Sequence, residues 1–354
     1  MAIPPSPPSP PSSAPSALLV DDARFSKHLP LGHHPERPER LTAARAAMAR
    51  SRLNFTRIAA REATLEELVR VHLPSFVEAL ERRRGASLYL DPDTYVGPDS
   101  VAAARLAAGG TVALIDAMLD AAPGSPEARG VALVRPPGHH ARPGKAMGFC
   151  LVNNVAVAAA HARARGLGRV AIVDYDVHHG NGTQEIFYRD PGVLYVSAHQ
   201  FPFYPGTGDS SELGEGDGRG YTINVPLTAG GGDAVYGGVF ERIILPVLEE
   251  YSPELVLVSA GFDAAIRDPL SEMRLGSEAF GWMTRELRRV AERSAGGRIA
   301  LVLEGGYDLV GLEAGLTSAL LALHEDPGSI ERGVDEPDVV RALAAVKAAW
   351  PHLG

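Results

Sequence analysis

The chain has little of three things that would point to particular kinds of protein: cysteine, net positive charge and long apolar runs. Cys150 is the only cysteine among 354 residues, so no disulfide can form within the chain. This usage suits a reducing compartment, and we expect a cytoplasmic protein. A formal net charge of −9 provides no basic footprint for nucleic acid. No apolar run approaches the ~18 residues of a membrane span. We therefore expect neither nucleic acid nor a membrane as a partner.

The N-terminal stretch MAIPPSPPSPPSSAPSALLV also lacks the charged segment that opens a secretory signal peptide, and prolines interrupt it throughout. Its proline, serine and alanine content predicts a disordered tail over residues 1–17. We expect the remainder, residues 18–354, to form one folded domain.

What the chain does contain is a regular alternation of short apolar runs and helix-like stretches. The runs, rich in β-branched residues, predict strands over 131–134, 170–173, 193–196, 255–258 and 299–303. The stretches predict helices over 99–120, 153–165, 233–251 and 277–294. Continuous apolar strands that alternate with helices are typical of an α/β fold, with a parallel sheet covered by helices on both faces.

Each of the five predicted strands is followed by a segment that combines glycine with histidine, aspartate or tyrosine. In chain order these segments are RPPGHHARPG, DYDVHHGNG, SAHQFPFYPGTGD, SAGFDAA and EGGYD. In open α/β sheets, ligands bind outside the carboxyl ends of the strands. Five such segments in step with five strands predict one site that gathers all of them.

Asp176 and His178 alternate just beyond a strand end, so their side chains share one face of extended chain and can hold one metal ion. Asp263, beyond another strand end, is the natural third ligand. Three protein ligands leave a position for water, as catalytic zinc requires. A polar loop without metal is the alternative for Asp176 and His178 alone. A second ion needs further carboxylates nearby, but Gly180 and Ala265 occupy the next alternate positions. The sequence therefore favours a single metal.

The motifs RPPGHHA, GFCLVNN, DYDVHHGNGTQ, FYPGTGD, SAGFDAAIRDP and LEGGY together resemble the histone deacetylase family, which includes bacterial deacetylase-like amidohydrolases and acetylpolyamine amidohydrolases. The resemblance runs from about Phe25 to about Leu320 and is nearest to the class II branch. It implies a single catalytic domain of the arginase/deacetylase fold, with an eight-stranded parallel sheet. Arginases hold two manganese ions, which Gly180 and Ala265 disfavour here.

The resemblance also implies roles for individual residues. Asp176, His178 and Asp263 would bind one catalytic Zn²⁺. His139 and His140 would be the tandem catalytic histidines, backed by Asp174 and Asn181 respectively, and Tyr307 would polarise the carbonyl. Residues implied to line a narrow substrate tunnel are Gly148, Phe149, Tyr204 and Leu270.

Further positions are implied for structural K⁺ or Na⁺ ions and for product release. One monovalent site would use Asp174, Asp176, His178, Ser197 and Ala198, and a second would use Phe187, Asp190, Val193 and Tyr221. Arg40, in HPERPERL, would lie beside an internal channel for acetate.

The expected function is zinc-dependent hydrolysis of acetyl or other acyl groups on lysine side chains of proteins or peptides. The alternative substrate class is small acetylated amines such as acetylpolyamines. A non-catalytic acyl-lysine reader is disfavoured because His139, His140 and Tyr307 are all present. The resemblance implies a glutamate at the position of Leu270 in polyamine-selective relatives, where it would pair with the distal ammonium of the substrate. Leucine has no charge, so it favours acyl-lysine as the substrate. The acyl chain and the oligomeric state stay open.

Overall fold

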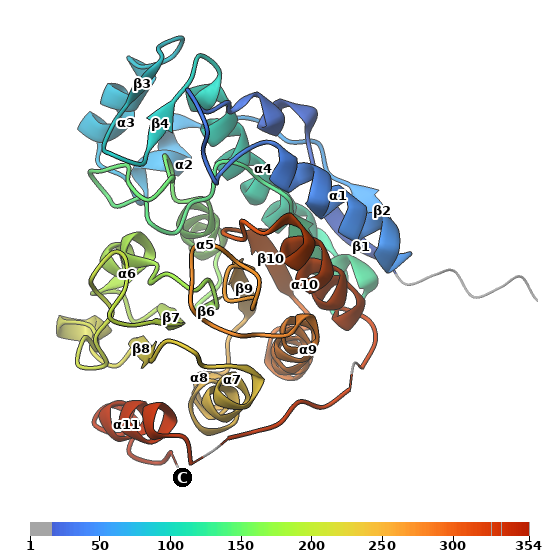
Figure 1. The fold of residues 1–354 in the computed structure, drawn as a ribbon, viewed down its shortest axis with the longest axis vertical. Helices are drawn as coiled ribbons and strands as arrows, with labels where there is room; N and C mark the ends of the chain where they lie inside the picture. The colour runs from blue at the N-terminus through green and yellow to red at the C-terminus, as the bar shows by residue number, and fades with distance from the viewer. Residues whose placement is uncertain (1–15, 327, 334, 354) are drawn as a thin grey trace, which may run out of the picture.

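A parallel sheet of eight strands forms the centre of the computed structural model, which describes residues 16–326, 328–333 and 335–353 (Figure 1). The strand order across the sheet is β2-β1-β5-β10-β9-β6-β7-β8. The strands are β1 (Ser16–Val20), β2 (Asn54–Arg57), β5 (Arg129–Ala132), β6 (Val170–Asp174), β7 (Val193–Gln200), β8 (Thr222–Leu227), β9 (Leu255–Ala260) and β10 (Ile299–Leu303). A small antiparallel hairpin, β3 (Leu88–Tyr89) and β4 (Tyr95–Val96), lies apart from this sheet.

Helices cover both faces of the sheet, and for this reason the strands are continuously apolar. Every residue of β6 to β10 is buried, as expected where neither face meets water. The helices are α1 (Glu39–Ser51), α2 (Leu65–Val69), α3 (Pro74–Glu81), α4 (Ser100–Asp120), α5 (Asn154–Ala164), α6 (Asn181–Phe187), α7 (Asp233–Val239), α8 (Leu245–Tyr251), α9 (Ser277–Ser294), α10 (Leu309–Ala322) and α11 (Pro337–Val346).

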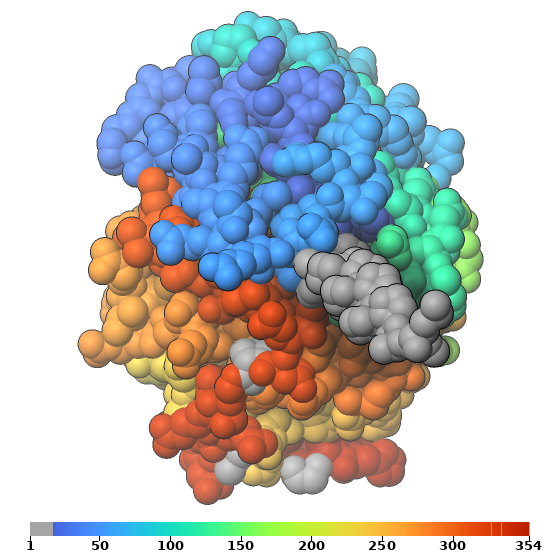
Figure 2. All heavy atoms as spheres, turned by 90° about the vertical axis from the view of Figure 1, so that its right-hand side faces the viewer, coloured from blue at the N-terminus to red at the C-terminus, as the bar shows by residue number. Residues whose placement is uncertain are grey.

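Two groups of helices enclose the sheet. Helices α4 and α5 pack together against β1, β5, β6 and β9, while α9 packs against β9 and β10 from the other side (Figure 1). Helix α10 packs on α9 and also on α1, so the first and last parts of the chain share one face of the molecule, blue and orange-red in Figure 2.

The α/β fold and all five predicted strands are confirmed, with ends that shift by a few residues. Strands β1, β2 and β8 were not predicted. The boundary of the predicted tail is wrong by two residues, because β1 begins at Ser16 and Ala17 is buried. The rest of that prediction, residues 1–15, lies outside the described residues. The predicted helix over 233–251 is continuous but contains a π-helical turn, Phe240–Ile244, between α7 and α8.

Helix α4 has the dimensions of a membrane span, although Arg105 and Asp116 interrupt its apolar run. By length and composition alone this 21-residue helix could cross a membrane. In the fold, 72% of its most apolar 18-residue window is buried, and its neighbours are α5, β1 and β5. Burial in the protein core accounts for its composition.

Candidate active site

The carboxyl ends of β5, β6, β7, β9 and β10 carry the motif segments, and the sheet register brings these segments together. Asp174, the last residue of β6, pairs with Ser197 on β7 and with Ser259 on β9. The segments that follow these strands therefore start side by side at one edge of the sheet. The predicted gathering of the motifs at a single site is confirmed.

Three buried side chains in this gathering form a metal-binding geometry. Ligand atoms of Asp176, His178 and Asp263 all lie within 4.8 Å of one another. His178 Nδ1 is 3.2 Å from Asp176 Oδ1 and 3.2 Å from Asp263 Oδ2. Among the described residues, the buried Asp263 Oδ2 has no hydrogen-bond partner. An orphaned carboxylate oxygen facing a ring nitrogen and a second carboxylate fits a cation with mixed nitrogen and oxygen ligands, as zinc prefers.

The outer oxygens of both carboxylates are held by backbone donors, which fixes the direction of the inner ones. The Gly305 N–H donates to Asp176 Oδ2 at 2.8 Å, and the Val177 N–H donates to Asp263 Oδ1 at 2.9 Å. Burial alone would lower the pKa of His178, but the two carboxylates outweigh it and raise that pKa to about 10. The proton retained there occupies the position that a divalent cation would take.

The position of Gly180 excludes the side chain that a second metal would require. A Cβ atom on Gly180 would lie 2.3 Å from Asp174 Oδ2 and 2.5 Å from the Tyr195 hydroxyl oxygen. A carboxylate cannot be accommodated at this residue, and the single metal stays a prediction.

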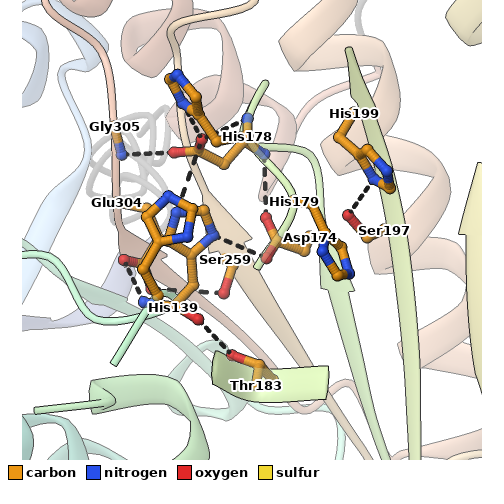
Figure 3. A network of polar contacts seen from close by, with 12 residues as sticks. His139, Asp174, His178, His179, Thr183, Ser197, His199, Ser259, Glu304 and Gly305 are labelled. Carbon is orange, nitrogen blue, oxygen red and sulfur yellow. Dashed lines mark hydrogen bonds and ion pairs between the residues drawn. The ribbon is translucent and has the colours of Figure 1, made fainter. Parts of the chain in front are cut away.

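The two tandem histidines lie in opposite electrostatic environments, with ring centroids 4.0 Å apart. His139 Nδ1 is 3.0 Å from Asp174 Oδ2, a contact that can be followed in Figure 3. Burial opposes protonation of His139, yet the carboxylates of Asp176 and Asp174 raise its pKa to about 10. His140 Nδ1 lies 2.8 Å from Asn181 Oδ1. Burial, followed by the neighbouring His139, places the pKa of His140 well below its usual value.

A cleft of about 440 Å³ leads to these groups from the surface and contains all four predicted tunnel residues. Tyr307 and His140 also line it. Gly148 has φ +55°, and a Cβ there would lie 2.4 Å from the His140 ring. Glycine is therefore required for this close approach. Two aromatic side chains form further parts of the wall: Phe149 meets Tyr307 edge-on at 5.7 Å, and Tyr204 meets His140 edge-on at 5.2 Å.

Three residues of the site were not predicted from the sequence. Phe203 also lines the cleft and stacks on His178 with centroids 5.4 Å apart. Glu304 Oε2 accepts the Gly138 N–H at 2.6 Å and the His139 N–H at 3.2 Å, and burial raises its pKa to about 7.

The third is Asp268, a buried carboxylate that joins two parts of the cleft. Its Oδ2 accepts the Tyr307 N–H at 2.6 Å and the Asp308 N–H at 3.1 Å, while Oδ1 accepts the Leu270 N–H at 3.0 Å. Burial, with the charge of Asp263 next, raises the pKa of Asp268 to about 7. The only sequence signal for it was an acidic residue close behind a predicted ligand.

Arg40 is fully buried, and its guanidinium lies 5.0 Å from the centroid of the Tyr307 ring. Its Nε donates to the Gly306 carbonyl at 2.7 Å, and its Nη1 donates to Glu36 at 3.1 Å. Arg40 thus lies behind the reactive end of the cleft, although its relation to a product channel stays a prediction.

The residues predicted for monovalent cations are also brought together. Asp174 and Ser197 are register partners. For the second set, the Asp190 N–H donates to the Phe187 carbonyl and the Val193 N–H donates to the Asp190 carbonyl. The Tyr221 carbonyl accepts from the neighbouring strand at Tyr195. Cation binding at either set stays a prediction.

An Asp–His–Asp triad beside a histidine pair and a tyrosine, at the carboxyl edge of a parallel sheet, defines a metal-dependent hydrolase. The histone deacetylase domain matches residues 34–323. Histone deacetylase 15 of Arabidopsis thaliana is 45% identical over 83% of this chain and 53% of its own length. A histone deacetylase-like amidohydrolase of Pseudomonas aeruginosa is 45% identical over 77% of this chain and 70% of its own.

Polyamine deacetylase HDAC10 of Homo sapiens is 42% identical over 90% of this chain, which spans 49% of that protein. The crystal structure of the HDA15 HD domain superimposes with a TM-score of 0.87 at 40% identity, covering 96% of this chain and 97% of that one. The chain belongs to the histone deacetylase family. It is a zinc-dependent deacetylase of that family, with Asp176, His178 and Asp263 as its metal site.

Removal of the metal should abolish amide hydrolysis, because the three ligands converge on one cation position. We expect chelator-treated protein to regain full activity at one equivalent of Zn²⁺ per chain, measured by activity and elemental analysis of the same samples. Two tightly bound catalytic ions per chain would contradict the argument from Gly180.

Proposed function

We propose that the protein hydrolyses acyl-lysine side chains of peptides or proteins. The observation that carries this proposal is that Phe149, Tyr204 and the apolar Leu270 line the cleft. Such walls suit the aliphatic stem of lysine, since apolar surface favours the burial of methylene groups. Leu270 provides no charge for the distal ammonium of a polyamine.

The residues around the metal site divide the chemistry of amide hydrolysis between them. Zinc, when bound at the triad, would acidify a water molecule and polarise the substrate carbonyl. The Tyr307 hydroxyl would donate a hydrogen bond to the oxyanion that develops on that carbonyl. His140 would take the proton from water and return it to the leaving amine.

The different environments of the two histidines support this division. His140 is backed by the neutral amide of Asn181 and has a lowered pKa, so it is neutral and can accept a proton. His139 is backed by Asp174 and has a raised pKa, so it carries a positive charge beside the reacting groups. A general base must be unprotonated at the start of the reaction, and His140 meets this requirement.

Hydrolysis of acetylated polyamines is the second candidate, and a specific observation favours it. The cleft is also lined by Asp93 and Glu272, whose carboxylates would attract a cationic substrate. The human relative named polyamine deacetylase shares 42% identity with this chain. The proposed preference for acyl-lysine therefore requires that the apolar Leu270 affects substrate choice more than Asp93 and Glu272 do.

We further propose that K⁺ or Na⁺ binds the two sets of residues around Ser197 and Tyr221, and that Arg40 assists release of acetate. The adjacency of Asp174 and Ser197 supports the first cation site. The buried guanidinium of Arg40 behind Tyr307 supports the role in product release, because it would attract an anion.

Replacement of His140 by alanine should reduce kcat/KM far more than replacement of His139. We expect a loss of ~10²–10⁴-fold for His140→Ala, the usual contribution of general acid–base catalysis. Steady-state kinetics on both variants, with thermal unfolding and zinc content as controls, would measure the difference. A larger loss for His139→Ala would exchange the two roles.

Tyr307→Phe should lower kcat by ~10²–10³-fold through loss of one oxyanion donor. Steady-state kinetics would measure the loss.

Asp268→Asn should lower kcat by ~10-fold, because loss of a charge-assisted acceptor loosens the Tyr307 backbone. If Asp268 acts through Tyr307, the double variant should lose little beyond Tyr307→Phe alone. Fully multiplicative losses in this double-mutant cycle would show that Asp268 has no connection to the tyrosine.

Wild-type protein should prefer an acyl-lysine peptide to acetylspermidine by kcat/KM. Leu270→Glu should shift the ratio toward acetylspermidine by roughly ten- to a hundredfold, since a charge-assisted contact contributes ~1.5–3 kcal/mol. Leu270→Gln, which adds similar bulk without charge, is the matched control. A wild-type preference for acetylspermidine would reject the proposal and promote the second candidate.

A further inference from the structure

A second cavity, about 520 Å³ in volume, lies beside the acyl-lysine cleft, and of the groups used in the chemistry above only Asn181 lines it. We call it the side cavity. Its lining includes Arg142, Lys145 and Met147, and also Asn181 and Arg189 on and after α6. The side cavity is therefore built from the segments that follow β5, β6 and β7.

The side cavity and the cleft are lined by consecutive residues of the same two segments. Met147 lines the side cavity, whereas the next residue, Gly148, lines the cleft. Likewise Pro205 lines the side cavity and Tyr204 lines the cleft. Tyr204 is 37% exposed, so part of its side chain is accessible beside the two openings. A chain that presents a lysine to the cleft would pass over Tyr204 to reach the side cavity.

The two openings differ in charge. Around the side cavity are Arg142, Lys145 and Arg189, with Glu185 as the acidic residue. Arg142 pairs with Glu185, and Arg189 pairs with Glu215 at 2.7 Å. Within the described part of the chain, Lys145 is exposed and has no ion-pair partner. The cleft, by contrast, has Asp93 and Glu272 among its lining residues.

We propose that the side cavity binds an acidic side chain of the peptide substrate, one or two residues away from the acyl-lysine. Extended chain advances ~3.3 Å per residue, which suits two openings that are lined by consecutive residues of the chain. Lys145 supplies the unpaired positive charge, whereas Arg142 and Arg189 are each neutralised by a glutamate. The acidic groups at the cleft would repel the same carboxylate and so set the direction in which the peptide lies. This inference rests on the proposed acyl-lysine function and names a feature of its substrate.

The test uses acetyl-lysine peptides that differ only in carrying Glu, Gln or Lys at positions −2, −1, +1 or +2. We expect Glu to be preferred over Gln at one of these positions by about two- to fivefold in kcat/KM, the range of an exposed ion pair. The effect should lie in KM, because the contact is equally present before and during the reaction. It should weaken as salt screens the charges.

Lys145→Glu should abolish or reverse the preference for Glu while leaving kcat on the Gln peptide unchanged. Arg52→Glu is the matched charge reversal, at the C-terminal end of α1 and before β2, on the opposite edge of the sheet. It should leave the preference intact.

The inference fails if peptides are hydrolysed with no preference for Glu, or if the preference survives Lys145→Glu. In either case the proposed function would stand. If acetylspermidine is hydrolysed and none of the peptides is, the proposed function itself fails, and the role of the side cavity fails with it.

Discussion

The structure depends on a concentration of negative charge in the interior of the protein. Asp174, Asp176, Asp263 and Glu304 are all buried where the central strands end. Isolated carboxylates in such a medium are strongly destabilised unless they gain hydrogen bonds and positive partners. Backbone N–H groups satisfy part of each carboxylate. The charge that remains requires protons or a metal cation, so the fold and the chemistry share one electrostatic constraint.

The same constraint separates two histidines that are neighbours in the sequence. His139 faces the carboxylates directly and keeps its proton, whereas His140 is turned toward the amide of Asn181 and the cleft. Because protonated His139 is adjacent, it lowers the pKa of His140 further. A single glycine, Gly148, allows the main chain to pass against the His140 ring. Charge distribution and close packing together leave His140 as a proton acceptor and His139 as a cation.

The metal triad and the five central strands were predictable because their signals are local: apolar β-branched runs, alternation of Asp176 with His178, and polar residues directly after strand ends. The roles of Asp268 and Glu304 were not predictable in this way. Asp268 binds the backbone of Tyr307, and Glu304 binds that of Gly138, 39 and 166 positions away. Such contacts are fixed by strand order, which the sequence pattern does not specify. Strand β8 was missed because Pro226 interrupts its pattern.

The central claim is that a proton on His178 balances the buried negative charge of the triad until a metal replaces it. Calorimetric titration of Zn²⁺ into metal-free protein at pH 7, repeated in buffers of different ionisation enthalpy, measures the protons released per ion bound. Because the raised pKa of His178 keeps its ring protonated at pH 7 without metal, the account predicts release of about one proton or more per zinc. Asp263→Asn should weaken binding. Zinc binding at full stoichiometry without proton release would contradict the account.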